Sequence, residues 1–212
     1  MDSIVAALDD PYSLLVRVLG VVGLRYGEAV TFERQAVDLL RRRLLVRRSV
    51  TEVSGHLVWG TPKSRAERQV PLPPSLAREL EQRLSTSVGS AADGLVFTGP
   101  NGGVVRLSNF NHRVWRAVLH RLGLPAAGVP VLRHSAAARM IAAGASPKAM
   151  QTVLGHANAG FTLSVHGHMF DADLDDLAQR LDEPRNASRS DFCGLLAACT
   201  RSTAPHGARH RP

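Results

Sequence analysis

The chain of 212 residues carries 26 lysines and arginines against 18 acidic residues, which gives a net charge of +8 and a pI near 10.8. Apolar residues make up 44% of the sequence, which is enough for a core and excludes wholesale disorder. The excess of positive charge favours a polyanion as partner, most commonly nucleic acid. A GC-rich genome that encodes many arginines would give the same charge, so charge alone does not decide.

The sequence carries no signal for export or for a membrane. Its first ten residues include Asp2, Asp9 and Asp10 and no basic stretch, unlike a signal peptide. No apolar run approaches the ~20 residues that span a bilayer. Cys193 and Cys199 form neither a disulfide framework nor a zinc-knuckle spacing. We therefore expect a cytoplasmic protein with no membrane partner, no metal and no cofactor.

In chain order, residues 1–10 predict an irregular lead-in, and Asp10-Pro11 opens an apolar helix that Gly23 ends. A short helix follows over residues 31–38. Val, Leu and Trp then alternate with turn residues, which predicts strands. The predicted strands, of which the first pairs with the other two, cover residues 44–50, 57–59 and 67–72.

The rest of the chain predicts more helices, until the apolar periodicity fails after Pro184. Residues 11–183 are therefore interpreted as one domain, and residues 184–212 as a basic, disordered tail. The fold class is α+β, mainly helical, with a three-stranded antiparallel sheet. The predicted helices, with a small hairpin at 95–105, cover residues 75–84, 108–122, 131–143, 147–154 and 171–181.

Four basic residues stand at positions that suit phosphate chemistry. Arg25 lies between glycines at a helix junction, where Glu28 can position it, and Arg133 begins an Ala-rich helix. Two arginines can clamp one phosphate and stabilise a five-coordinate transition state. Lys63, at a turn tip, can protonate a leaving oxygen, and His156 can donate a hydrogen bond to the phosphate. Taken singly, such residues are more often helix caps or solvated surface groups.

Four motifs around these residues, in this order, resemble those of the tyrosine recombinase, or phage integrase, catalytic domain. They read GLRYGE, TPKSR, LRHS and LGH, and the resemblance covers about residues 11–182. The resemblance implies that Arg25 and Arg133 are the two catalytic arginines, Lys63 the catalytic lysine and His156 the phosphate-contacting histidine. It also implies double-stranded DNA as partner and DNA recombination and integration as the activity.

The sequence departs from this family's pattern at the nucleophile and at one histidine. The family's tyrosine, which attacks the phosphodiester, is expected at position 166, where this chain has His166. The only tyrosines, Tyr12 and Tyr26, lie near the N-terminus. Pro130 stands where the family usually has a catalytic histidine, and proline has no side-chain proton to give. The N-terminal DNA-clamping domain of the family is also expected to be absent.

Three interpretations follow from these departures. The leading one is a DNA-binding recombinase-fold protein, truncated and impaired in strand cleavage, either a decayed remnant or a regulator. The second is an active strand transferase with His166 as nucleophile, because histidine can form a phosphoramidate. The third is a metal-binding module of His134, His156, His166 and His168, which lacks Cys or clustered carboxylates to complete it.

The densest basic run offers a second DNA contact. Arg41, Arg42 and Arg43 stand together before the first predicted strand, and we expect them to contact the DNA backbone. Self-association, or assembly with other recombinase subunits, stays open. The target DNA sequence cannot be read from these residues, since base contacts depend on side chains in a groove.

Overall fold

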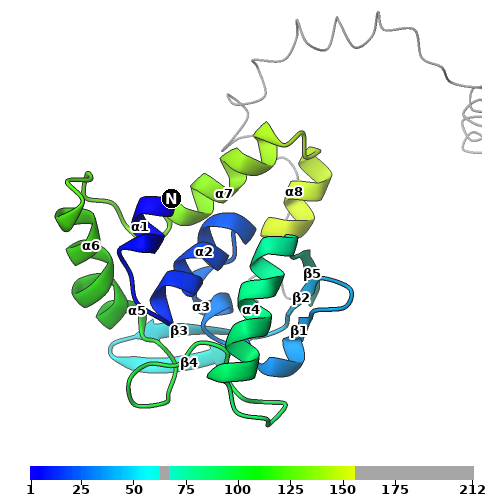
Figure 1. The fold of residues 1–212 in the computed structure, drawn as a ribbon, viewed down its shortest axis with the longest axis horizontal. Coiled ribbons are helices and arrows are strands. Elements are labelled where there is room, and N and C mark those ends of the chain that lie inside the picture. The colour runs from blue at the N-terminus through cyan, green and yellow to red at the C-terminus, as the bar shows by residue number, and fades with distance from the viewer. Residues whose placement is uncertain (63–66, 156–212) are drawn as a thin grey trace, which may run out of the picture. The chain divides into compact units, whose positions relative to one another are not determined.

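Helices are the commonest regular elements of the computed structural model, which describes residues 1–62 and 67–155 (Figure 1). All of them belong to one structural unit, Met1–Phe170. The helices are α1 (Asp2–Ala6), α2 (Tyr12–Val22), α3 (Tyr26–Ala29), α4 (Pro74–Thr86), α5 (Leu107–Asn109), α6 (Arg116–Arg121), α7 (Val131–Ala142) and α8 (Pro147–Leu154), with a 3-10 turn η1 (Arg34–Ala36) and a π-helical segment η2 (Phe110–Trp115).

The strands form two antiparallel sheets, which confirms the α+β class with a three-stranded antiparallel sheet, although the third strand of that sheet is residues 37–38 and not the strand predicted at 57–59. The first sheet has the order β1-β2-β5 and the second is a hairpin of β3 and β4. In the first, Leu44 of β2 lies opposite Val70 of β5, and in the second Val50 lies opposite Trp59. The strands are β1 (Val37–Asp38), β2 (Arg43–Val46), β3 (Ser49–Val53), β4 (His56–Gly60) and β5 (Arg68–Pro71).

The single strand predicted over residues 44–50 is in fact two strands, β2 and β3. The chain leaves the strand conformation at Arg47 and Arg48, and both side chains form ion pairs with the buried Glu33. The pairing partners were nevertheless correctly predicted, because β2 pairs with β5 and β3 with β4. The interruption separates the predicted sheet into two.

The core is built around α2, whose buried apolar residues occupy most of its circumference and leave one side to Ser13 and Arg17. A helix with so wide an apolar surface must be covered by several elements, and α7 packs along α2 (Figure 1). Trp115 is fully buried and donates its indole N–H to the carbonyl of Ala127, 2.8 Å away. The buried residues of α2 are Leu14, Leu15, Val16, Val18, Leu19, Gly20 and Val22.

Three further predictions differ from the structure or lie beyond it. The lead-in predicted to be irregular contains α1, against which α2 packs. The helix predicted over residues 108–122 has a π-helical middle, and the hairpin predicted at 95–105 retains one bridge, between Thr98 and Val104. The predicted helix at 171–181 and the tail at 184–212 lie outside the described residues.

Within residues 1–62 and 67–155, no helix is both long and apolar enough to cross a membrane. Two of the helices at the site, α2 and α8, end at a glycine. Gly23 ends α2 with φ 76° and Gly155 ends α8 with φ 65°, both in the left-handed region that glycine adopts without strain.

Candidate functional site

Arg25 lies at the junction that Gly23 creates between α2 and α3. The left-handed turn at Gly23 redirects the chain, and Arg25 becomes the N-cap of α3 in an extended conformation. Glu28, three residues on, accepts a bond from the Arg25 backbone N–H at 3.0 Å and from its guanidinium at 3.3 Å. The predicted positioning of Arg25 by Glu28 is therefore confirmed.

Glu28 has a second and closer partner in Arg68 of β5. The guanidinium of Arg68 donates to both carboxylate oxygens, at 3.0 and 2.8 Å, in a bidentate pair. The Glu28 side chain is completely buried and that of Arg68 is 7% exposed. Burial alone would raise the pKa of Glu28. The bonds and charge of Arg68, joined by those of Arg25, outweigh it and hold that pKa below its ordinary value.

Arg133 reaches the same region from the first turn of α7. Its guanidinium donates to the carbonyl oxygens of Gly23 and Leu154, both at 2.6 Å. Burial, together with the positive charges of Arg25 and Arg68 and against the opposing charge of Glu28, lowers the pKa of Arg133 to about 10. At neutral pH Arg133 therefore remains a cation, held close to two others.

The three arginines meet at the C-terminus of α8. The last carbonyl groups of a helix lack partners inside the helix and carry its negative dipole end. Here Arg68 Nε donates to the carbonyl of Val153 at 3.1 Å, Arg133 to that of Leu154, and Arg25 to that of Gly155 at 3.3 Å. We call Arg25, Arg68, Arg133 and Glu28 the α8-end cluster.

Arg25 and Arg133 keep donors for a ligand. A guanidinium has five N–H groups, and residues of the described ranges accept from two of them in each of these arginines. The Arg25 side chain is 29% exposed. A cavity of about 140 Å³ lies against both, and Pro130 also lines it. The lining of this cavity is almost wholly apolar, so the two adjacent cations, and not the cavity, favour an anion. The donors that the described residues leave unused on these cations suit a tetrahedral oxyanion.

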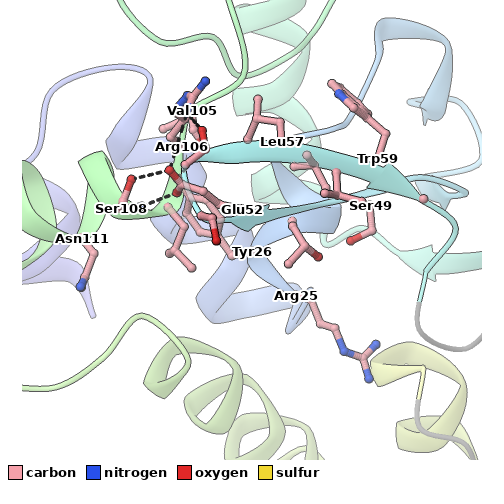
Figure 2. Close-up of a pocket in the computed structure, with 18 of the residues that line it drawn as sticks. Arg25, Tyr26, Ser49, Glu52, Leu57, Trp59, Val105, Arg106, Ser108 and Asn111 are labelled. Atoms are coloured by element: carbon pink, nitrogen blue, oxygen red, sulfur yellow. Dashed lines mark hydrogen bonds and ion pairs between the residues drawn. The ribbon is translucent and has the colours of Figure 1, made fainter.

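A larger groove of about 720 Å³ extends from Arg25 along the β3–β4 hairpin (Figure 2). Glu52 of β3 fastens the hairpin to α5, because its carboxylate accepts bonds from the Ser108 amide at 3.1 Å and hydroxyl at 2.8 Å. Arg106 donates to the carbonyl of Gly55 at the hairpin tip. Figure 2 shows Arg25 pointing away from the hairpin, toward the yellow ribbon of α8.

The arginine run, Arg41 to Arg43, covers the end of the turn between β1 and β2 and the first residue of β2. Arg41 pairs with Asp38 at 3.3 Å, and its side chain is 84% exposed. Arg42 has φ 51°, and Arg43 donates to the Arg42 carbonyl. These bonds are local, so the run presents its charge to solvent.

The structure brings together two of the five predicted catalytic residues, Arg25 and Arg133. Lys63, His156 and His166 lie outside the described residues, although residue 156 directly follows Gly155 in the chain. The histidine-rich metal site is likewise untested, because three of its four histidines lie outside. Among residues 1–62 and 67–155, no three His, Cys, Asp or Glu side chains are grouped to hold a metal.

Arg68 is the site residue that the sequence analysis missed. The burial of β5 alternates, with Arg68 and Val70 inward and Gln69 and Pro71 outward. A charged residue at an inward position of an alternating strand is unusual unless it has a buried partner. The inward position of a charged residue was therefore the signal for Arg68. It can be recognised only after the inward and outward positions of β5 have been assigned.

Residues 1–171 match the model of the phage integrase family. The chain belongs to the phage integrase family. A protein named as a prophage phiRv2 integrase, from Mycobacterium tuberculosis, is 31% identical over 165 residues, which cover 77% of this chain and 44% of that one. A XerC-like tyrosine recombinase from Caldanaerobacter subterraneus is 26% identical over 182 residues, covering 76% of this chain and 46% of that one. The chain thus spans less than half the length of these relatives.

Solved structures of family members share the fold. The Tn1549 transposon integrase, in complex with transposon right end DNA, superimposes with a TM-score of 0.69 at 19% identity, covering 84% of this chain and 63% of that one. The catalytic domain of bacteriophage HP1 integrase gives 0.59 at 18% identity, covering 89% and 94%. The expected tyrosine-recombinase catalytic-domain fold is thereby confirmed.

Proposed function

We propose that this chain binds double-stranded DNA through the α8-end cluster and serves in DNA recombination or integration, with strand cleavage impaired. The observation that carries the proposal is the convergence of Arg25 and Arg133 at one helix end. Their free donors can hold the non-bridging oxygens of one backbone phosphate. The similarity to an integrase whose structure contains transposon end DNA supports the choice of partner.

Lys63 and His156 complete the proposed phosphate site. His156 is the next residue in the chain after Gly155, whose carbonyl Arg25 binds. We assign His156 the role of hydrogen-bond donor to the phosphate and Lys63 that of proton donor to the leaving 5′ oxygen. The arginine run would add contacts to neighbouring phosphates. We also propose that the chain acts on DNA in the cytoplasm. Association with further recombinase subunits is part of the same proposal.

The impairment follows from positions 166 and 130. In the proposed chemistry a hydroxyl nucleophile forms a bond to phosphorus while the bond to the 5′ oxygen breaks, and that oxygen takes up a proton. His166 offers no hydroxyl, and the ring of Pro130 lines the cavity between the two arginines without a proton to exchange. Loss of a nucleophile that acts within a catalytic unit lowers the rate by about 10⁴-fold or more.

The test is a covalent-adduct assay on nicked duplex DNA of mixed sequence. The wild type is compared with the double variant His166→Tyr, Pro130→His, and with the same variant carrying Arg133→Gln as control. We expect an adduct from the double variant alone, because only that variant has both a nucleophile and the phosphate clamp. An acid-labile adduct from the wild type would identify His166 as a working nucleophile and overturn the impairment. Equal reaction of the Arg133→Gln control would overturn the clamp.

A further inference from the structure

Arg68 donates more side-chain hydrogen bonds at the site than Arg25 or Arg133, the two arginines that we propose hold a phosphate. Its guanidinium binds both oxygens of Glu28 and the carbonyl of Val153, so each of its three nitrogens has a bond. Gly155 lies flat against it, since a Cβ at Gly155 would come within 2.8 Å of Arg68 Cζ. A group so enclosed is placed to hold other groups rather than to take a ligand.

The two partners of Arg68 lead directly to the ligand-facing arginines. Glu28 fixes both the backbone and the guanidinium of Arg25. The end of α8 gives its next two carbonyl oxygens to Arg133 and Arg25. A shift of Arg68 would therefore move Glu28 and the helix end, and with them the spacing between the two clamp arginines.

We propose that Arg68 is a positioning residue that sets the distance and orientation of Arg25 and Arg133 for one phosphate. The inference rests on the proposed function, because it requires that those two arginines bind a phosphate together. Lysine could keep the charge of Arg68 but not its role. An ammonium group is a point charge without a planar fork, so it cannot bind both Glu28 oxygens and the Val153 carbonyl in the same directions.

The experiment titrates inorganic phosphate into the full chain and follows the side-chain Nε–H signals of Arg25 and Arg133 by NMR. In the wild type we expect both signals to move with one shared midpoint. In Arg68→Lys we expect the midpoint to rise on the order of tenfold or the two signals to move separately, because small misplacements of a binding group cost that much.

Arg83→Lys is the matched control. The Arg83 side chain is 8% exposed, against 7% for Arg68, donates through Nε to the carbonyl of Val96 at 2.7 Å, and pairs with Asp10 at 3.2 Å. It therefore loses the same kinds of contact outside the α8-end cluster. Its phosphate midpoint should equal that of the wild type, even where its thermal stability falls as far as that of Arg68→Lys.

A wild-type midpoint in Arg68→Lys would overturn the positioning role and leave the clamp intact. Equal weakening in Arg83→Lys would also overturn it, since general loosening would then suffice. No response of Arg25 and Arg133 in the wild type would overturn the proposed clamp and this inference together. If Arg68→Lys does not fold, the double variant Glu28→Gln, Arg68→Gln removes both buried charges at once. Wild-type phosphate binding by that variant would equally overturn the positioning role.

Discussion

The α8-end cluster and the arginine run use the same side chain in opposite ways. In the run, three consecutive exposed arginines lie where a turn leads into β2, and the side-chain bonds of Arg41 and Arg43 are local. In the cluster, three arginines from α3, β5 and α7 share one carboxylate or one helix end. The density of charge along the sequence therefore marks a solvent-facing surface, whereas isolated arginines build the enclosed site.

The largest difference in stability should come from the two carboxylates that pair with these arginines. Glu28→Ala leaves Arg68 as a buried charge without its main partner, which costs about 3–5 kcal/mol. Asp38→Ala removes the exposed partner of Arg41 and should leave the urea unfolding midpoint unchanged. Urea denaturation at pH 7 measures both. Equal midpoints for the two variants would contradict the distinction between the regions.

Gly155→Ala should have the next largest effect. The left-handed φ of 65° costs an L-residue about 1–2 kcal/mol, and the new Cβ would also displace Arg68. Gly123→Ala is the control, since Gly123 has φ 64° and no atom within 4 Å of an added Cβ. The excess loss in Gly155→Ala over Gly123→Ala therefore reports the contact with Arg68. No excess would mean that this contact is easily relieved.

A smaller effect is expected from acid. The pKa of Glu28 in the folded state lies below its ordinary value of 4.5, so the unfolded chain binds the proton more readily. The stability that Glu28 contributes is thus present above about pH 4.5 and is lost as the pH falls through the folded value. Glu28→Gln should flatten the fall in unfolding midpoint between pH 5 and pH 3. An unchanged slope would show that Glu28 does not carry this dependence.

Replacing the arginine run by glutamine at positions 41, 42 and 43 should leave stability unchanged. Its effect appears in DNA binding, where each lost phosphate contact lowers the slope of log K against log salt by about 0.9. A fall of about 2 to 3 in that slope on mixed-sequence duplex DNA would place all three arginines on phosphates. An unchanged slope would remove the run from the DNA interface.

The sequence predicts α2, α4, α7 and α8 well because their end signals are local. Ser146 and Pro147 begin α8, whose N-cap is Ser146, and Gly155 ends it, as the sequence indicates. The helix predicted over residues 31–38 is wrong, since that segment holds only the 3-10 turn η1 followed by β1. The division of the predicted strand at Arg47 and Arg48 is missed because Glu33, which holds them, lies 14 residues before the nearer one. Local propensity carries no record of such a partner.

Part of the site is predictable for the same reason, and part is not. Arg25 and Arg133 stand in short motifs at helix ends, so residue type and position are read together. The role of Arg68 depends on contacts 40 residues away with Glu28 and 85 residues away with Val153. A helix carbonyl accepts a bond from any donor, so no residue pattern in α8 announces which arginine will reach it.

The three capped carbonyls at the end of α8 also bear on the order in which the protein folds. Their donors come from 130, 85 and 21 residues earlier in the chain, so the helix end gains all its contacts only after distant segments have met. Unfolding experiments should find this turn formed late and released early. In a chain that has not finished folding, Arg25 and Arg133 would then not be held together at the end of α8. The phosphate site would form only in the completely folded protein.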